Sequence, residues 1–234
     1  MCPQHPSLRI YRVHLTLLSA KLSASKPTHN PRFGRAVLRR LTATLDPTDP
    51  PHIIYAALLA TISHLSPYAT PNPSPQSLHD THAALAAVDD LLERATRDNH
   101  TPVVLLAHVL RLRIVVIAGL RDSVAPALTQ AENALGVAYP AASTPDDTRT
   151  SQYPATSAAC QNSQPVIFPV AFDAFMAIHT LIFGVVFHTQ VGNAAEAFVR
   201  LTHLHALLDA NVLQRAPHGI VTVSQQFELH PTST

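Results

Sequence analysis

The fifteen histidines are the side chains of this sequence best suited to chemistry, because imidazole binds metals and transfers protons. Two pairs lie close together, His79 with His82 and His203 with His205. The first pair could share a helix face, whereas residues two apart on a helix face apart. Asp80, the acid nearest the first pair, points elsewhere, and no pair belongs to an HExxH or Cys/His motif. We therefore expect no metal and no cofactor, and interpret the histidines as solvated or core-edge side chains.

Other patterns of catalytic residues are equally weak. Cys2 and Cys160 lie far apart and make neither a disulfide framework nor a metal site, which fits a reducing compartment. The acid pairs 89–90 and 146–147 are neighbours in sequence, so neither suggests two carboxylates held across a cleft. No glycine-rich phosphate loop and no GxSxG motif occurs. The sequence predicts a protein that is not an enzyme, and an enzyme with scattered catalytic groups is the alternative.

Charged residues are few and nearly balanced. They make up 13% of the chain, against about a quarter in a typical soluble domain, and the net charge is +1. Arg39 and Arg40 are adjacent, but the residues after them do not suggest a basic stripe. This balance predicts no strong direct contact with nucleic acid and no attraction to an anionic membrane. Residues 1–10 lack the apolar region of a signal peptide.

Two apolar segments, 103–118 and 174–189, raise the question of a membrane span. His108, Arg111 and Arg113 interrupt the first. The second has no permanent charge but falls short of the roughly 20 apolar residues that a span needs. A helix that is apolar nearly all round is otherwise a buried core helix. We expect the latter and no membrane contact, with a membrane anchor as the alternative.

Apolar residues recur at helical spacing between clusters of proline. Glycine is scarce, with 6 residues, and proline is plentiful, with 20, which favours helices joined by proline-rich loops. The predicted helices cover about 7–22, 32–45, 50–65, 77–97, 102–118, 123–135, 168–190 and 194–211. Their predicted N-caps are Asp49, Thr101, Ser123 and Asn193. Gly119 is the predicted left-handed residue at the end of the fifth helix, and the sixth and seventh helices are predicted to end at Gly136 and Gly192.

Two stretches echo each other. In each, a long apolar helix ends at a glycine and an amphipathic helix follows: Leu135 comes 16 residues after Gly119, and Leu208 comes 16 residues after Gly192. This spacing is typical of a degenerate tetratricopeptide repeat, whose stacked hairpins bury one another's apolar faces. We therefore predict an all-α fold of stacked antiparallel helix hairpins in a tetratricopeptide-like superhelix. An ordinary helical bundle with two similar hairpins is the alternative.

Residues 139–165 differ from the rest, because they are rich in Ser, Thr, Pro, Ala and Gln and show no apolar periodicity. This composition predicts a flexible insertion. We divide the chain into helical hairpin repeats over 1–138, the insertion over 139–165, and a further hairpin with a short extension over 166–234. Within that extension, 220–223 alternates like a short strand near the C-terminus.

Six blocks together resemble a known family. They are HPSLRIYRVHLTLLSAKL (5–22), LLAHVLRLRIVV (105–116), AENALGVAY (131–139), IHTLIFGVVFHTQVGNAAEA (178–197), RLTHLHALLD (200–209) and PHGIVTV (217–223). Their order is similar to that in the fungal form of the helical-repeat subunit of the cohesin loader, of which they cover a part. The resemblance implies a non-catalytic scaffold that wraps the extended N-terminal segment of the large loader subunit. It also implies an indirect link to cohesin, and a nuclear role in loading cohesin on chromatin for sister-chromatid cohesion and chromosome segregation in the cell cycle.

A groove for such a partner is predicted from repeat geometry, in which the first helix of each hairpin lines the inside. The positions expected there are Leu106, Val109, Arg113, Val116, His179, Ile182, Val186 and Thr189. Arg113 is the strongest candidate, because an arginine inside an apolar helix needs a partner. The alternative is that most of these side chains pack between helices. A tetratricopeptide-like adaptor of another complex would have the same groove and a different partner.

Overall fold

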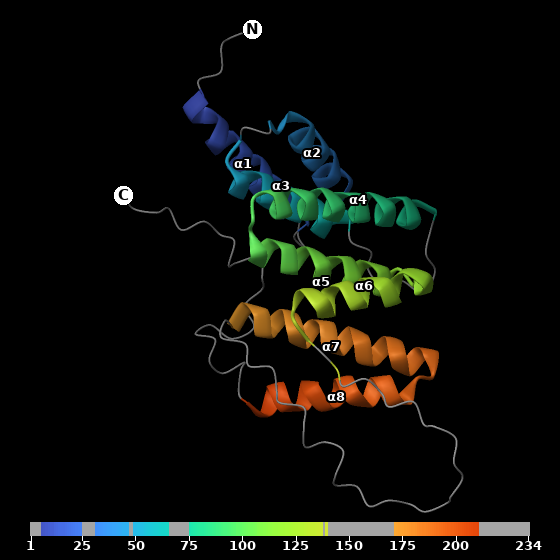
Figure 1. Cartoon of the computed structure of the whole chain (residues 1–234). Helices are drawn as coiled ribbons and strands as arrows, with labels where there is room; N and C mark the ends of the chain where they lie inside the picture. Colours follow the sequence, from blue (N-terminus) through green and yellow to red (C-terminus); the bar gives the residue numbers. More distant parts are fainter. Residues whose placement is uncertain are drawn as a thin grey trace, which may run out of the picture. The chain divides into compact units, whose positions relative to one another are not determined.

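The computed structural model describes residues 6–24, 31–46, 49–65, 75–137, 139 and 171–210, and over these residues the chain is all-α (Figure 1). Its helices are α1 (Pro6–Ala24), α2 (Pro31–Thr44), α3 (Pro51–Leu65), α4 (Pro75–Arg97), α5 (Thr101–Ile117), α6 (Arg121–Ala134), α7 (Ala171–Val191) and α8 (Ala194–Asp209). The predicted all-α class and the stacking of helix hairpins are confirmed. The predicted strand at 220–223 and the predicted insertion after Tyr139 lie outside the described residues.

The chain separates into two compact units, which are described one at a time. The first holds α1 to α5 and the part of α6 up to Ala127. The second holds α6 from Leu128 onward, together with α7 and α8. The division therefore falls inside a helix, whereas the sequence analysis placed its boundary at 138.

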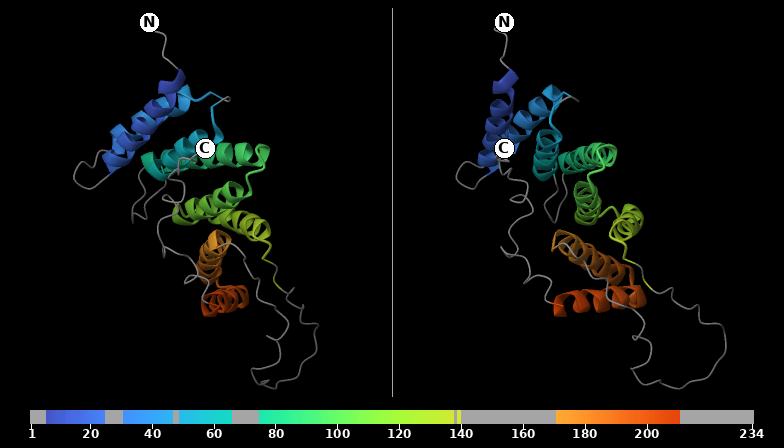
Figure 2. Two further views of the ribbon diagram at one scale, coloured as in Figure 1. Left: turned by 90° about the vertical axis from the view of Figure 1, so that its left-hand side faces the viewer. Right: turned by 60° about the vertical axis from the view of Figure 1, so that its left-hand side comes forward.

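In the first unit, α1 and α2 pack side by side as a hairpin, which both views of Figure 2 show. Their apolar residues meet those on one face of α3 in a cluster of buried side chains. That cluster comprises Val13, Ala20, Leu38, Leu41, Ile53 and Ala57. The small side chains of Ala20 and Ala57, both fully buried, let these helices approach closely.

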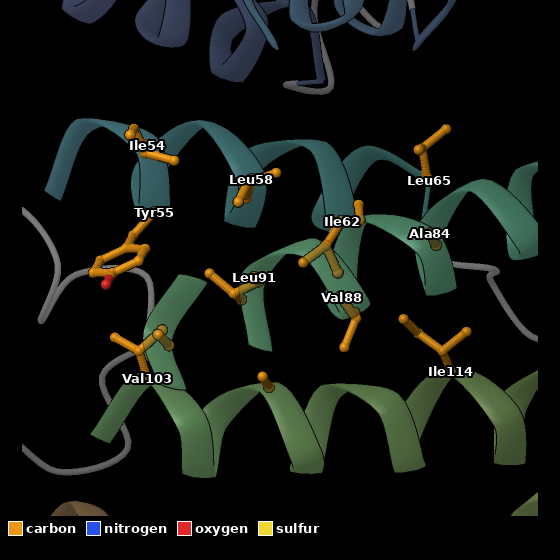
Figure 3. Close-up of a cluster of buried hydrophobic side chains, with 13 residues drawn as sticks. Ile54, Tyr55, Leu58, Ile62, Leu65, Ala84, Val88, Leu91, Val103 and Ile114 are labelled. Carbon is orange, nitrogen blue, oxygen red and sulfur yellow. The ribbon is translucent and has the colours of Figure 1, made fainter. Parts of the chain in front are cut away.

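The other face of α3 forms a second cluster with α4 and α5 (Figure 3). Leu91 of α4 lies fully buried between Ile62 of α3 and Val103 of α5. Adjacent residues of α3, such as Ile53 and Ile54, thus belong to different clusters. A helix buried on two faces must be apolar nearly all round, and this explains the composition of α3.

In the second unit, α7 and α8 form an antiparallel hairpin. Gly192 adopts φ +80° between them, a conformation that glycine reaches without strain. Its neighbour's N–H, that of Asn193, donates to His188 O at 2.8 Å and so closes the end of α7. The Asn193 side chain in turn accepts from Glu196 N and caps α8, as predicted. The same pattern of positive φ and backbone hydrogen bonds occurs at Gly119 and Gly136, so all three predicted C-terminal glycines are confirmed.

Three of the four predicted N-caps are wrong. Asp49 does not cap α3; its carboxylate accepts from Asp46 N and from Arg9 instead. Thr101 lies inside α5, whose cap position is His100 without a side-chain hydrogen bond. Ser123 lies inside α6, which begins two residues earlier at Arg121. In each case a proline near the start of the helix prompted the prediction. Proline suits several positions of the first turn, because the backbone N–H groups there have no partner within the helix, so it does not locate the cap.

Candidate functional site

The positions predicted to line a groove on α5 are mostly covered. Leu106 and Val109 are only 4% and 6% exposed, and Val116 is half-buried. Arg113 is exposed, and its side chain makes no ion pair with any described residue. Burial therefore does not oblige Arg113 to find a partner, and its role in binding stays a prediction. Leu106 and Val109 fit the alternative interpretation, in which these residues pack inside the protein.

The four positions predicted on α7 are all exposed and share one helix face. Ile182 and Val186 are 42% and 40% exposed, and His179 and Thr189 flank them at helical spacing. Nδ1 of His179 lies 2.8 Å from Phe175 O, and the Thr189 hydroxyl donates to Val185 O at 2.7 Å. The Thr189 hydroxyl and Nδ1 of His179 thus have partners within their own helix, whereas Nε2 of His179 would need a hydrogen-bond partner from any ligand that covers this face.

The expectation that α7 is buried all round is also corrected. One side of α7 is buried at Ala174, Ala177, Leu181 and Gly184, while the side that carries Ile182 is exposed. Among the described helices, α7 alone is long and apolar enough to cross a membrane by length and composition; it has 21 residues, and 39% of its apolar window is buried in the protein. A one-sided apolar helix is typical of a protein-binding surface as well.

The buried side of α8 is not the side with the most large apolar residues. Phe198, Leu201 and Leu208 are exposed. The buried positions are Ala197, Arg200 and Leu207. Arginine is rarely buried without a partner, so the surroundings of Arg200 explain how this helix is oriented.

Arg200 is held by two carboxylates. Its Nε and Nη2 donate to the two oxygens of Glu132 at 2.8 and 3.0 Å, which is a bidentate pair, and both residues are 6% exposed. Nη1 donates to a carboxylate oxygen of Glu196 at 2.6 Å and to the Glu196 carbonyl at 3.2 Å. Bidentate pairs of this kind are stronger and more directional than single hydrogen bonds.

Tyr139 completes this buried ion cluster. Its hydroxyl donates to Glu132 at 2.9 Å, and the Arg200 guanidinium carbon lies 4.6 Å from the centre of its ring. The His203 ring packs edge-on against the same tyrosine at 5.2 Å. The residues at 132, 139, 196 and 200 thus connect α6, the segment after it, and α8.

The pKa shifts in the cluster favour fixed charges. Burial alone lowers the pKa of Arg200, but hydrogen bonds to Glu132 and Glu196 outweigh it, so that this pKa is raised. Burial, followed by the charge of Glu132, raises the pKa of Tyr139 and keeps its hydroxyl protonated. Burial, followed by the positive charge of Arg200, lowers the pKa of His188 nearby. With its donors engaged by fixed acceptors, the cluster stabilises the packing of helices and offers no free acid or base.

Gly184 of α7 makes room for the Arg200 side chain. A Cβ atom at this position would lie 2.6 Å from Cδ and 2.9 Å from Nε of Arg200. Gly184→Ala should therefore lower the free energy of unfolding by about 1–3 kcal/mol through overpacking, despite a gain of about 1 kcal/mol in helix propensity. Urea denaturation followed by circular dichroism measures the difference.

The same glycine change in an Arg200→Ala background is the control. Without the arginine side chain, Gly184→Ala should stabilise the protein, because only the gain in helix propensity remains. An equal loss of stability in both backgrounds would place the clash elsewhere, for instance against Leu128, whose Cδ1 lies 3.4 Å from the added carbon.

The histidines form no cluster of the kind that holds a metal: within the described ranges, no group of three or more His, Cys, Asp or Glu residues could bind one. His79 and His82 are exposed on α4, and His205 is exposed on α8. His108 is half-buried, and its Nδ1 has no hydrogen-bond partner among the residues that the structure describes. Burial, followed by the charge of Arg111, lowers the pKa of His108, so its ring is neutral near pH 7.

Comparisons with known proteins identify no relative, so a functional assignment has to be argued from the fold and from these surfaces. No family model, no curated protein and no solved structure matches the chain. The class that the observations define is a helical-repeat-like all-α protein with exposed apolar helix faces and a buried ion cluster.

Proposed function

We propose that the protein is a non-catalytic scaffold whose α7 face, defined by His179, Ile182, Val186 and Thr189, binds a segment of a partner protein. The observation that carries this proposal is the exposure of those four side chains along one face of a largely apolar helix. Exposed apolar faces of this kind are typical of protein interaction sites. An extended or helical segment would cover Ile182 and Val186 while the two polar side chains keep their bonds within α7.

The partner that we propose is the extended N-terminal segment of the large subunit of the cohesin loader. The resembling block 178–209 coincides with most of α7 and all of α8. The order of the other blocks and the stacked hairpins support the same assignment. The chain would then act in the nucleus, supporting the loading of cohesin on chromatin for sister-chromatid cohesion. An adaptor of another complex would use the same α7 face with another partner.

Ile182→Asp tests the α7 face. A charge in the middle of an apolar contact leaves a desolvated carboxylate without a partner. We expect the variant to recover at most about one tenth of the large loader subunit that the native chain recovers. A tenfold loss of affinity corresponds to about 1.4 kcal/mol of binding free energy. The measurement is a quantitative pull-down of the tagged chain from nuclear extract of its own source.

Val191→Asp is the matched control, because Val191 lies on the same helix, is 61% exposed, and points away from the face. It should bind like the native chain. Unchanged binding of Ile182→Asp with intact helicity would remove the α7 face from the interaction. Recovery of an unrelated complex in place of the loader subunit would contradict the cohesin assignment and leave the scaffold proposal. Recovery of the native chain in membranes would contradict both.

A further inference from the structure

The face of α3 that packs on the α1–α2 hairpin ends in a titratable side chain. Ile53, Ala57 and Ala60 of α3 belong to the cluster that α1 and α2 share with this helix. His64 stands four residues after Ala60, so it continues the same face toward the end of the helix. Its side chain is half-buried. The interface between the hairpin and α3 is therefore apolar along most of its length and carries an imidazole at one end.

Three helices converge on this imidazole ring. A Cβ atom added to Gly34 of α2 would lie 2.8 Å from Cε1 of His64 and 2.5 Å from Oγ of Ser23, near the end of α1. The Ser23 side chain is itself buried and donates to Ala20 O at 2.7 Å. Glycine at position 34 thus lets the histidine ring and the end of α1 lie directly against the backbone of α2. An ionised ring would be confined at the same place.

The charged side chains around His64 come from the helices that pack on α3. From α2 comes Arg35, which is half-buried and forms an ion pair with Asp80 of α4. The carboxylate of Asp80 is thus already engaged by a cation. Lys21 of α1 and His79 of α4 are exposed, so water and salt screen their charges. Among the described residues, Arg35 is therefore the charge that acts on the histidine within the interface.

These surroundings favour the neutral form of the ring. Burial, followed by the charge of Arg35, lowers the pKa of His64, and the hydrogen bond to the Ala20 backbone offsets only part of this effect. An opened chain, in which the pKa of histidine is about 6.5, takes up a proton more readily than the packed interface does. The stability that the neutral ring contributes is complete above this ordinary pKa and is lost as the pH falls below it. Acid consequently favours the opened form.

We propose that His64 makes the docking of the α1–α2 hairpin on α3 sensitive to pH. Near neutral pH the uncharged ring completes the interface against Gly34. Protonation puts a second cation beside Arg35 in a half-buried contact, and the hairpin separates from α3 so that the imidazolium reaches water. The cluster of α3, α4 and α5 does not include His64 and stays packed. This device does not depend on which partner uses the α7 face.

Two other histidines of the first unit are placed less well for this role. His108 is half-buried, and its pKa is lowered first by burial and then by the charge of Arg111. It belongs to α5, which packs on α4, so its protonation would act first on those two helices. His52 lies near the start of α3 and is exposed. Of the three histidines, His64 is the one whose ring lies in the interface with the hairpin.

Hydrogen exchange of the full chain, followed by mass spectrometry at about pH 7.5 and about pH 5.5, tests the proposal. The rates are corrected for the intrinsic effect of pH on amide exchange, and the opening constant of α1 and α2 is divided by that of α5. We expect this ratio to rise at least about threefold at the lower pH, because the proton that His64 takes up favours the opened hairpin.

His64→Gln is the variant of the interface. Glutamine keeps an N–H donor and has no charge at either pH, so the ratio should change by less than about 1.5-fold between the two conditions. His52→Gln makes the same change at the exposed start of α3 and should respond to acid as the native chain does. If the folded His64→Gln variant keeps the native response, His64 is not the sensor and the proposal is overturned.

The native chain alone also decides the proposal, whether or not the glutamine variant folds. A titration of His64 by nuclear magnetic resonance, with the signal assigned through its neighbours in the chain, should give a pKa below the ordinary value of histidine. A pKa at or above that value would contradict the confinement of the ring. A ratio that acid leaves unchanged, because the hairpin stays docked or because α5 opens equally, would likewise overturn the proposal.

Discussion

Replacing Glu132 by alanine is expected to lower the free energy of unfolding by about 3–5 kcal/mol. The reason is that Arg200, 6% exposed, loses both oxygens of its bidentate partner and keeps only Glu196. The Tyr139 hydroxyl loses its acceptor in the same change. A buried cation without its partner is costly, because the solvation lost on folding is no longer offset. Urea denaturation measures the loss, and hydrogen exchange should show faster opening in α7 and α8.

Glu93→Ala is the matched control, since it also removes a carboxylate from an ion pair with arginine. Glu93 and Arg97 are 69% and 63% exposed on α4, so their attraction is screened by water. The control should change the free energy of unfolding by about 0.5 kcal/mol or less. If the two alanine variants lose equal amounts, burial does not distinguish the pairs, and the cluster around Arg200 is not the stabilising contact that we describe.

Leu91→Ala is expected to cost about 3–5 kcal/mol and to act on the first unit. Leu91 is fully buried between α3 and α5, where the removed atoms leave a cavity that neighbouring side chains fill only in part (Figure 3). The loss should appear as faster hydrogen exchange in α3, α4 and α5, with little change in α7 and α8. The Glu132→Ala and Leu91→Ala variants therefore report on different units of the chain.

Leu208→Ala provides the same chemical change at an exposed site, since Leu208 is 42% exposed on α8. It should cost less than about 1 kcal/mol, because little packing is lost. A loss at Leu91 as small as that at Leu208 would show that the cluster between α3, α4 and α5 is poorly packed, contrary to the fold described above.

The helices could be predicted because their determinants are local. Apolar periodicity and the glycines at 119, 136 and 192 lie within each helix or directly after it, and the predicted ends agree with the observed ones to within a few residues. The helix starts at Thr101 and Ser123 were misassigned because several positions of a first turn suit proline and a small polar residue equally well. Only Asn193 was predicted correctly as a cap. Its side chain accepts a hydrogen bond from the backbone N–H of Glu196, three residues later.

The orientation of α8 could not be predicted from α8 alone. Its large apolar residues at 198, 201 and 208 are exposed, whereas the buried face carries Arg200. Its partner Glu132 lies 68 residues earlier, and the space for its side chain depends on a glycine of α7. A signal was present, since Arg200 is spaced by three and seven residues from Ala197 and Leu207, which are both buried. The four α7 positions were located by repeat geometry, but their role in binding stays a prediction.

The position of α3 has a consequence for how the first unit opens. Since α3 belongs to both clusters, the helices beyond it on each side are coupled through one shared element, as neighbouring repeats are coupled in a linear array. The α1–α2 hairpin is held to this unit mainly through its contacts with α3, so we expect this layer to fray without opening the cluster between α3, α4 and α5. A ligand that binds only the closed layer suppresses this fraying by mass action. A partner that contacts α1 and α2 would then be detected as slower exchange of amide protons in these two helices.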